Sequence, residues 1–173
     1  MNPVLATLLP LTFRQSDLAY RLGLLREFLE FCFFTQQSAS ADVAALGPFS
    51  AAGRHGPGDI GFLQKLSPGV FASFQSGSFH AILDQALAEA KALPTLRLTV
   101  AVILSTEEVA ALGQWARQAV DERIMLEFSV DPEIGAGCQL LWHDTIHEYS
   151  LGMLLRKNEA QLAERIPALL EAA

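Results

Sequence analysis

The amino-acid sequence predicts an α+β protein, in which an N-terminal helical domain (residues 1–94) precedes a small β-α-β-β-β-α module (residues 96–173). Three observations predict this class. Apolar residues recur at helical spacing up to Pro94, which stops the last helix of the first half. A continuous β-branched run then follows at Leu98–Leu104. Beyond it, a capped helix leads into segments whose apolar residues alternate as they do in strands.

The composition is that of a globular chain with an acidic balance. The 173 residues are 51% hydrophobic and only 18% charged, with a formal net charge of −7. An acidic balance argues against a nucleic-acid-binding protein, because such proteins concentrate Lys and Arg on one face. High apolar and low charged content predicts instead that a partner covers part of the surface. No apolar run reaches the roughly 18–20 residues that span a bilayer, so we expect a cytoplasmic protein.

The first long periodic segment predicts a helix from Ser16, its expected cap, to Phe34. Apolar residues beyond its main stripe predict that the helix is buried on more than one side. Cys32 belongs to this stripe, and with Cys138 it is expected to be a buried thiol of a reducing compartment. The inward-facing residues are Leu18, Leu22, Leu25, Leu29 and Cys32, joined by Phe28 and Phe33.

Glycine and proline punctuate the rest of the first half. A short helix is predicted to end at Gly47-Pro48, and a glycine-rich loop is expected from Gly47 to Gly61. Predicted helices lie at Ala41–Leu46, at about Ile60–Leu66 and Pro68–Gln75, and from the Ser78 cap to Leu93.

In the second half, Leu98–Leu104 is predicted to be a strand covered on both faces. Ser105-Thr106-Glu107-Glu108 is a capping box that opens a helix. Ile124–Val130 is predicted to be a half-buried strand, in which the inward Ile124, Leu126, Phe128 and Val130 alternate with the outward Met125, Glu127 and Ser129. Gly137–Trp142 and Thr145–Tyr149 then form a hairpin about His143-Asp144, and Ser150 caps a final helix that runs to about Leu169.

Two patterns leave an enzyme open as an alternative. Gly56 to Gly61 matches G-x-G-x-x-G, but no strand precedes it, and a connector is favoured over a dinucleotide loop. His143 and His147 have the four-residue spacing of zinc ligands, but such ligands converge on a helix rather than across a hairpin turn. We therefore expect no catalytic residue, cofactor or metal. A small metal-dependent enzyme that uses His143 and His147 remains the alternative.

The turn before the hairpin carries the most specific pattern of the chain. A strand ending at Asp131 is followed by the small-residue turn Gly135-Ala136-Gly137. Gly137 is typical of a position that needs positive φ or close backbone approach. The hairpin then delivers Glu148-Tyr149-Ser150, with Leu155 five residues after the serine.

In this order of elements and residues, Leu98–Leu170 resembles the C-terminal domain of the delta subunit of F-type ATP synthases, called OSCP in mitochondria. Asp131, Gly137, Glu148 and Ser150 occupy positions of that family's motif, with Glu148 where the family usually has Asp. A similar module occurs in stator proteins of vacuolar-type, flagellar and type III secretion ATPases, which stay open as alternatives.

The resemblance implies a non-catalytic peripheral-stalk subunit, held at the inner face of the membrane through its complex and linking the catalytic head to the membrane sector during proton-driven ATP synthesis. It also implies that the helical half binds the alpha subunits and the C-terminal half binds a b-type stalk subunit. Amphipathic helices docking in apolar grooves would serve both contacts. The residues we expect at these contacts are Phe28, Leu29 and Phe33 in the first half, and Leu151, Leu155 and Leu162 in the second.

Overall fold

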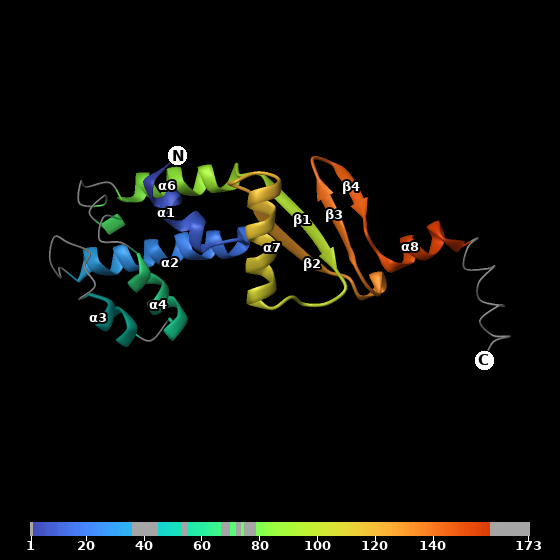
Figure 1. Ribbon diagram of the computed structural model, residues 1–173. Coiled ribbons are helices and arrows are strands. Elements are labelled where there is room, and N and C mark those ends of the chain that lie inside the picture. The colour runs from blue at the N-terminus through green and yellow to red at the C-terminus, as the bar shows by residue number, and fades with distance from the viewer. Residues whose placement is uncertain are drawn as a thin grey trace. The chain divides into compact units, whose positions relative to one another are not determined.

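The computed structural model describes residues 2–35, 45–52, 55–66, 70–71, 74 and 79–159 (Figure 1). The chain divides into two compact units, Met1–Leu93 and Pro94–Ala173. Within the described residues the first unit is helical and the second contains a four-stranded sheet, which confirms the predicted α+β class. None of the described helices combines the length and apolar character needed to cross a bilayer.

The first unit is built around α2 (Gln15–Phe34). The whole predicted leucine stripe of this helix is buried, and so is Leu24, which lies outside the stripe. At 3.6 residues per turn, however, the buried positions, Leu24 included, fall within one arc of about 160° of the helix, so the predicted burial on more than one side is wrong. The predicted cap is wrong: the N-cap is Arg14, two residues earlier, and the Ser16 hydroxyl bonds to Asp17 instead.

Helix α1 (Pro3–Leu8) and the short 3-10 helix η1 (Leu9–Leu11) were not predicted from periodicity. The side-chain oxygen of Asn2 caps α1 by accepting from the backbone N–H of Val4 at 2.9 Å. The Asn2 side-chain nitrogen donates to the carbonyl of Ile82 on α6 (Phe79–Lys91), at 3.0 Å. The Asn2 backbone N–H donates to Glu89, also on α6. One buried asparagine thus ties α1 to a helix about eighty positions away in the sequence.

The predicted loop from Gly47 to Gly61 is wrong, because two helices form there, α3 (Leu46–Ala51) and α4 (Pro57–Lys65). Each proline lies in the first turn of its helix, where its missing N–H is not needed. Phe49 of α3 and Phe62 of α4 are buried, and this packing offsets the low helix propensity of the glycines. Most residues of the predicted helices at 41–46 and 68–75, and the predicted cap Ser78, lie outside the described residues.

The second unit is a sheet with strand order β2-β1-β3-β4. Strands β1 (Thr95–Val100) and β2 (Met125–Val130) are parallel and are joined through α7 (Thr106–Ala119). Strands β3 (Cys138–Trp142) and β4 (Thr145–Glu148) add antiparallel beyond β1. The core lies between α7 and one face of the sheet. Its buried members are Leu96, Leu98, Val100, Ala116, Ile124 and Leu126.

The first strand differs from the prediction in length and burial. It ends at Val100, and Val102 and Ile103 beyond it are 64% and 83% exposed. The prediction of a strand covered on both faces is wrong, because buried residues alternate along β1 with the exposed Arg97. The Arg97 guanidinium pairs with the carboxylate of Glu127 on β2 at 2.7 Å. The sheet face opposite α7 is therefore polar at this position.

The predicted alternation along β2 holds only in part. Leu126 is buried and Phe128 is packed against the core, as expected. Met125 was predicted to face outward but is fully buried, whereas Val130 was predicted to face inward and is 48% exposed.

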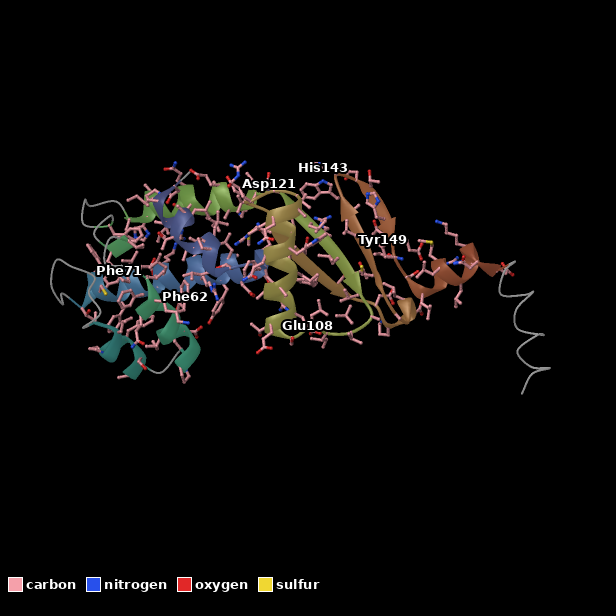
Figure 2. All side chains as sticks on the ribbon, in the orientation of Figure 1. Phe62, Phe71, Glu108, Asp121, His143 and Tyr149 are labelled. Atoms are coloured by element: carbon pink, nitrogen blue, oxygen red, sulfur yellow. The ribbon has the colours of Figure 1, made fainter. Side chains whose placement is uncertain are left out.

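The capping box of α7 is confirmed. The Ser105 hydroxyl accepts from the backbone N–H of Glu108 at 3.2 Å, and the Glu108 carboxylate accepts from the backbone N–H of Ser105 at 2.8 Å. Figure 2 shows Glu108 and Asp121 at opposite ends of this helix. The predicted hairpin turn is also confirmed, since His143 and Asp144 both have positive φ, as a two-residue turn of type I′ requires.

Candidate functional site

The junction of β3, β4 and α8 (Leu151–Lys157) brings together three residues of the motif named above. Gly137 has a φ of +91°, and a Cβ added there would lie 2.1 Å from the carbonyl oxygen of Tyr149. No side chain fits this close approach of two backbones. The Tyr149 N–H donates to the carbonyl of Cys138, and the Leu151 N–H donates to that of Ala136, each at 2.8 Å. Gly137 is thus enclosed by the chain that leads into α8.

Ser150 connects the hairpin to α8 through its side chain. It is 4% exposed, and its hydroxyl accepts from the backbone N–H of Met153 at 3.1 Å, which confirms the predicted cap. The same hydroxyl donates to the carboxylate of Glu148 at 2.5 Å. Arg156 of α8 lies 3.7 Å from that carboxylate. These contacts fix the direction in which α8 leaves the sheet.

Asp131 acts one step earlier, at the end of β2. Its carboxylate caps the 3-10 helix η3 (Pro132–Ile134) by accepting from the backbone N–H of Glu133 at 2.9 Å. Its own N–H donates to the carbonyl of Val100, also at 2.9 Å. Asp131 therefore positions the turn that delivers Gly137, without touching the junction itself.

Helix α8 exposes its leucines. Leu151, Leu154 and Leu155 are each 48% exposed, and none of the seven residues of α8 is buried. Leu154 was not among the residues expected at a contact, and the structure adds it to the exposed set. The spacing i, i+3, i+4 places the three on one helical face. Leu162, also expected at a contact, lies outside the described residues.

Near α8, Tyr149 and Ile146 are 57% and 68% exposed, and sequence reasoning did not single them out as surface residues (Figure 2 labels Tyr149). The alternation of side chains along β4 was the feature of the sequence that could have assigned Ile146 to the exposed face. In the register of the hairpin, Ile146 faces the same side of the sheet as Leu141 and Glu148.

The three residues expected at contacts in the first unit have different positions. Phe28 is fully buried, with its ring edge-on to those of Phe49 and Phe71 at centroid distances of 5.2 and 5.8 Å. Leu29 is 4% exposed. Phe33 is 69% exposed, although the helical spacing placed it with the inward set. Only Phe33 of the three offers its side chain to a partner.

The two patterns that suggested an enzyme are placed as follows. His143 lies in the hairpin turn with its ring stacked on Trp142, and His147 lies on β4 (Figure 2 labels His143). Gly56 is the N-cap of α4, and the Asp59 carboxylate accepts from its backbone N–H at 3.1 Å, where a dinucleotide would place a phosphate. The described residues contain no group of three or more His, Cys, Asp or Glu arranged to hold a metal ion. Burial also raises the pKa of the Cys32 thiol, which lowers its reactive thiolate fraction.

Compared with known proteins, the sequence matches no family model and no curated protein.

Proposed function

We propose that this protein is a non-catalytic peripheral-stalk subunit of an F-type ATP synthase, held at the inner face of the membrane through its complex. One observation carries the proposal. Residues that the resemblance singled out meet at one junction, where the backbone of Tyr149 packs closely against Gly137, next to the Glu148–Ser150 pair. That junction directs a helix whose leucines are exposed.

A stator transmits force, so its contacts must be fixed in direction as well as strong. A capped helix whose first turn is bonded to Glu148 of β4 and to Ala136 in the turn before β3 meets that need, because α8 cannot swing without breaking the bonds of Ser150 and Leu151. Leu151, Leu154 and Leu155 would then pack against the b-type stalk helix by helix-to-helix docking. Full burial of one leucine side chain on binding contributes about 1.5–3 kcal/mol before the cost of association. In the first unit, Phe33 would contribute to the contact with the alpha subunits.

The proposal is tested by purification of the tagged full-length chain from the cells that encode it, under mild solubilisation, with quantitative mass spectrometry of the bound subunits. A b-type stalk subunit and the alpha subunit should be enriched in amounts comparable to the tagged chain. Enrichment of a flagellar, type III secretion or vacuolar-type ATPase would transfer the stator role to that machine. Absence of every rotary or export ATPase subunit would contradict a stator role.

A matched pair of variants sharpens this experiment. The double variant Leu151→Asp/Leu155→Asp changes the net charge by −2 on the leucine face of α8, and it should lose the stalk subunit. Lys157→Asp also changes the net charge by −2, but away from that face, and it should keep the stalk subunit. Equal retention by both variants would remove α8 from the contact.

A further inference from the structure

A cavity of about 460 Å³ lies in the first unit, remote in sequence from the α8 junction. One wall is a stripe of α2 whose residues recur at helical spacing, so that they form a continuous row. The opposite wall comes from α3 and from the residue that precedes the cap of α4. The lining residues are Glu27, Glu30, Phe31 and Phe34 of α2, Phe49 and Ala52 at α3, and His55.

Aromatic rings make up the apolar part of this cavity. Phe31 is edge-on to Phe49 at a centroid distance of 5.4 Å, and His55 stacks on Phe49 at 4.6 Å. Phe49 is 4% exposed and is held in the core by Phe28, so this part of the wall is rigid. Phe34 is 78% exposed although it lines the cavity, so its ring face is open to a ligand that enters.

Two carboxylates give the cavity its charge. Glu27 lies 3.3 Å from the imidazole of His55, and Glu30 lies 3.9 Å from that of His80 on α6. Among the described residues that line the cavity there is no Lys or Arg, so Glu27 and Glu30 give this lining a negative charge. Arg26, the neighbour of Glu27 in the sequence, pairs with Asp84 of α6 instead.

Carboxylates beside phenyl rings select for one kind of ligand. An anion would be repelled by both glutamates, and an apolar group would displace water from them without replacing its hydrogen bonds. An organic cation satisfies both features, because its charge pairs with the carboxylates and is also attracted to the faces of aromatic rings. A guanidinium does this best, since it is planar, stacks on rings and donates two parallel hydrogen bonds to a carboxylate.

We propose that this cavity binds the guanidinium of an arginine side chain presented by a partner protein. Glu27 and Glu30 accept its hydrogen bonds, and Phe31 and Phe34 provide the rings. The volume lies within the roughly 300–1,000 Å³ of small-ligand sites, enough for one side chain. The inference rests on the first unit alone and is independent of the proposed stalk function, so either can fail without the other.

The test uses the purified full-length chain and three small probes, N-acetyl-arginine, N-acetyl-lysine and N-acetyl-citrulline, all as methylamides. Citrulline has nearly the shape of arginine but no charge. Binding is followed by NMR shift changes during titration. The arginine probe should bind with a Kd on the order of 1 mM, the lysine probe more weakly, and the citrulline probe at least about tenfold more weakly. Equal binding of arginine and citrulline would overturn the proposal.

Variants test whether the arginine probe binds in this cavity or binds anywhere on the acidic surface. Glu27→Gln/Glu30→Gln should weaken arginine binding at least about tenfold, which corresponds to about 1.4 kcal/mol. The control Glu107→Gln/Glu122→Gln removes the same charge at exposed positions of the second unit and should leave binding unchanged. Phe34→Leu tests the rings at an exposed position that does not endanger folding, and it should weaken binding severalfold. An equal loss in the control, or none in either cavity variant, would contradict the assignment.

One further variant identifies the occupant. Arg54 precedes His55 in the sequence. If the arginine probe binds only after Arg54→Ala, the chain's own guanidinium fills the cavity, and the proposal of an external partner is wrong. We expect the same affinity with and without this substitution.

Discussion

In the first unit, α2 buries seven side chains along one broad face, whereas none of the seven residues of α8 in the second unit is buried. The long helix is held by its apolar surface, through rings and leucines that come from distant parts of the sequence. The short helix is held by its first turn, through Ser150, Glu148 and the backbone bond to Ala136. The difference teaches that a helix can be oriented by polar contacts, most of them at its start, while its leucines stay exposed.

The two units can be compared within the full-length chain. Both tryptophans, Trp115 and Trp142, lie in the second unit, so tryptophan fluorescence follows the unfolding of that unit alone. Helical circular dichroism is weighted toward the first unit, which contains α2 and α6. Urea titrations followed by both signals therefore report on each unit.

The largest effect is expected at the centre of the first unit. Phe28→Ala removes a fully buried ring that contacts Phe49 and Phe71, and it should lower the free energy of unfolding of that unit by about 3–5 kcal/mol. The circular dichroism midpoint should fall while the tryptophan midpoint stays in place. Phe33→Ala is the matched control, since this ring is exposed, and its effect should stay within about 0.5 kcal/mol. Equal effects of the two variants would contradict the described burial of α2.

The next effect is expected at the α8 junction. Gly137→Ala places a Cβ against the Tyr149 carbonyl at a positive φ, and it should destabilise the second unit by about 3 kcal/mol, measured by tryptophan fluorescence. Gly135→Ala is the control: its φ is also positive, but nothing lies within 4 Å of the added Cβ. Strain alone should cost about 1–2 kcal/mol there. If Gly135 proved the more sensitive position, the close approach at Gly137 would not hold the junction.

A smaller effect is expected from the cap of α8. Ser150→Ala removes the acceptor for Met153 and the donor to Glu148, and it should cost about 1–2 kcal/mol. Ser150→Thr keeps the hydroxyl but adds a methyl group at a buried site, so it should retain only part of the stability. Tryptophan fluorescence during urea unfolding compares the three proteins. If Ser150→Ala left the free energy of unfolding unchanged, this would show that the cap does not orient α8.

The smallest effect concerns acid sensitivity of the second unit. Hydrogen bonds from the backbone and hydroxyl of Ser105 lower the pKa of Glu108. A carboxylate whose folded pKa lies below its unfolded value stabilises the fold above the unfolded pKa, and this contribution is lost as pH falls through the folded value. Glu108→Gln should therefore make tryptophan-detected stability less dependent on pH below about 4.3, the ordinary glutamate value. Unchanged pH dependence would remove Glu108 from the acid response.

The two units also differ in how much of their structure could be predicted from the sequence. In the second, signals are local: Ser105 and Glu108 form their box within one turn, His143-Asp144 closes a two-residue hairpin, and Ser150 caps the next helix. Such contacts span a few residues and can be recognised from spacing. The end of β1 at Val100 could not be recognised from the sequence, because Val102 and Ile103 have as high a β-propensity as the strand itself. Only the pairing with β2 decides where the strand ends.

In the first unit the deciding contacts are distant in sequence. Asn2 with Ile82 and Glu89 fixes α1, and the packing of Phe49 on Phe28 favours a helix where glycine and proline indicated a loop. The cavity also depends on contacts between residues that are distant in the sequence. Glu27, Glu30, Phe31 and Phe34 form a visible stripe on α2, but the opposite wall appears only once α3 and His55 are placed. Spacing alone could not bring these walls together.

The measurement that tests the stalk function most directly is calorimetric titration of the purified full-length chain with the stalk helix of the b-type subunit from the same genome. We expect one segment to bind per chain, with affinity lost in Leu151→Asp/Leu155→Asp and kept in both Lys157→Asp and Glu27→Gln/Glu30→Gln. That pattern would place the stalk contact on the leucine face of α8 and separate it from the cavity of the first unit. No binding, or binding that the leucine substitutions leave unchanged, would contradict the proposed role of α8.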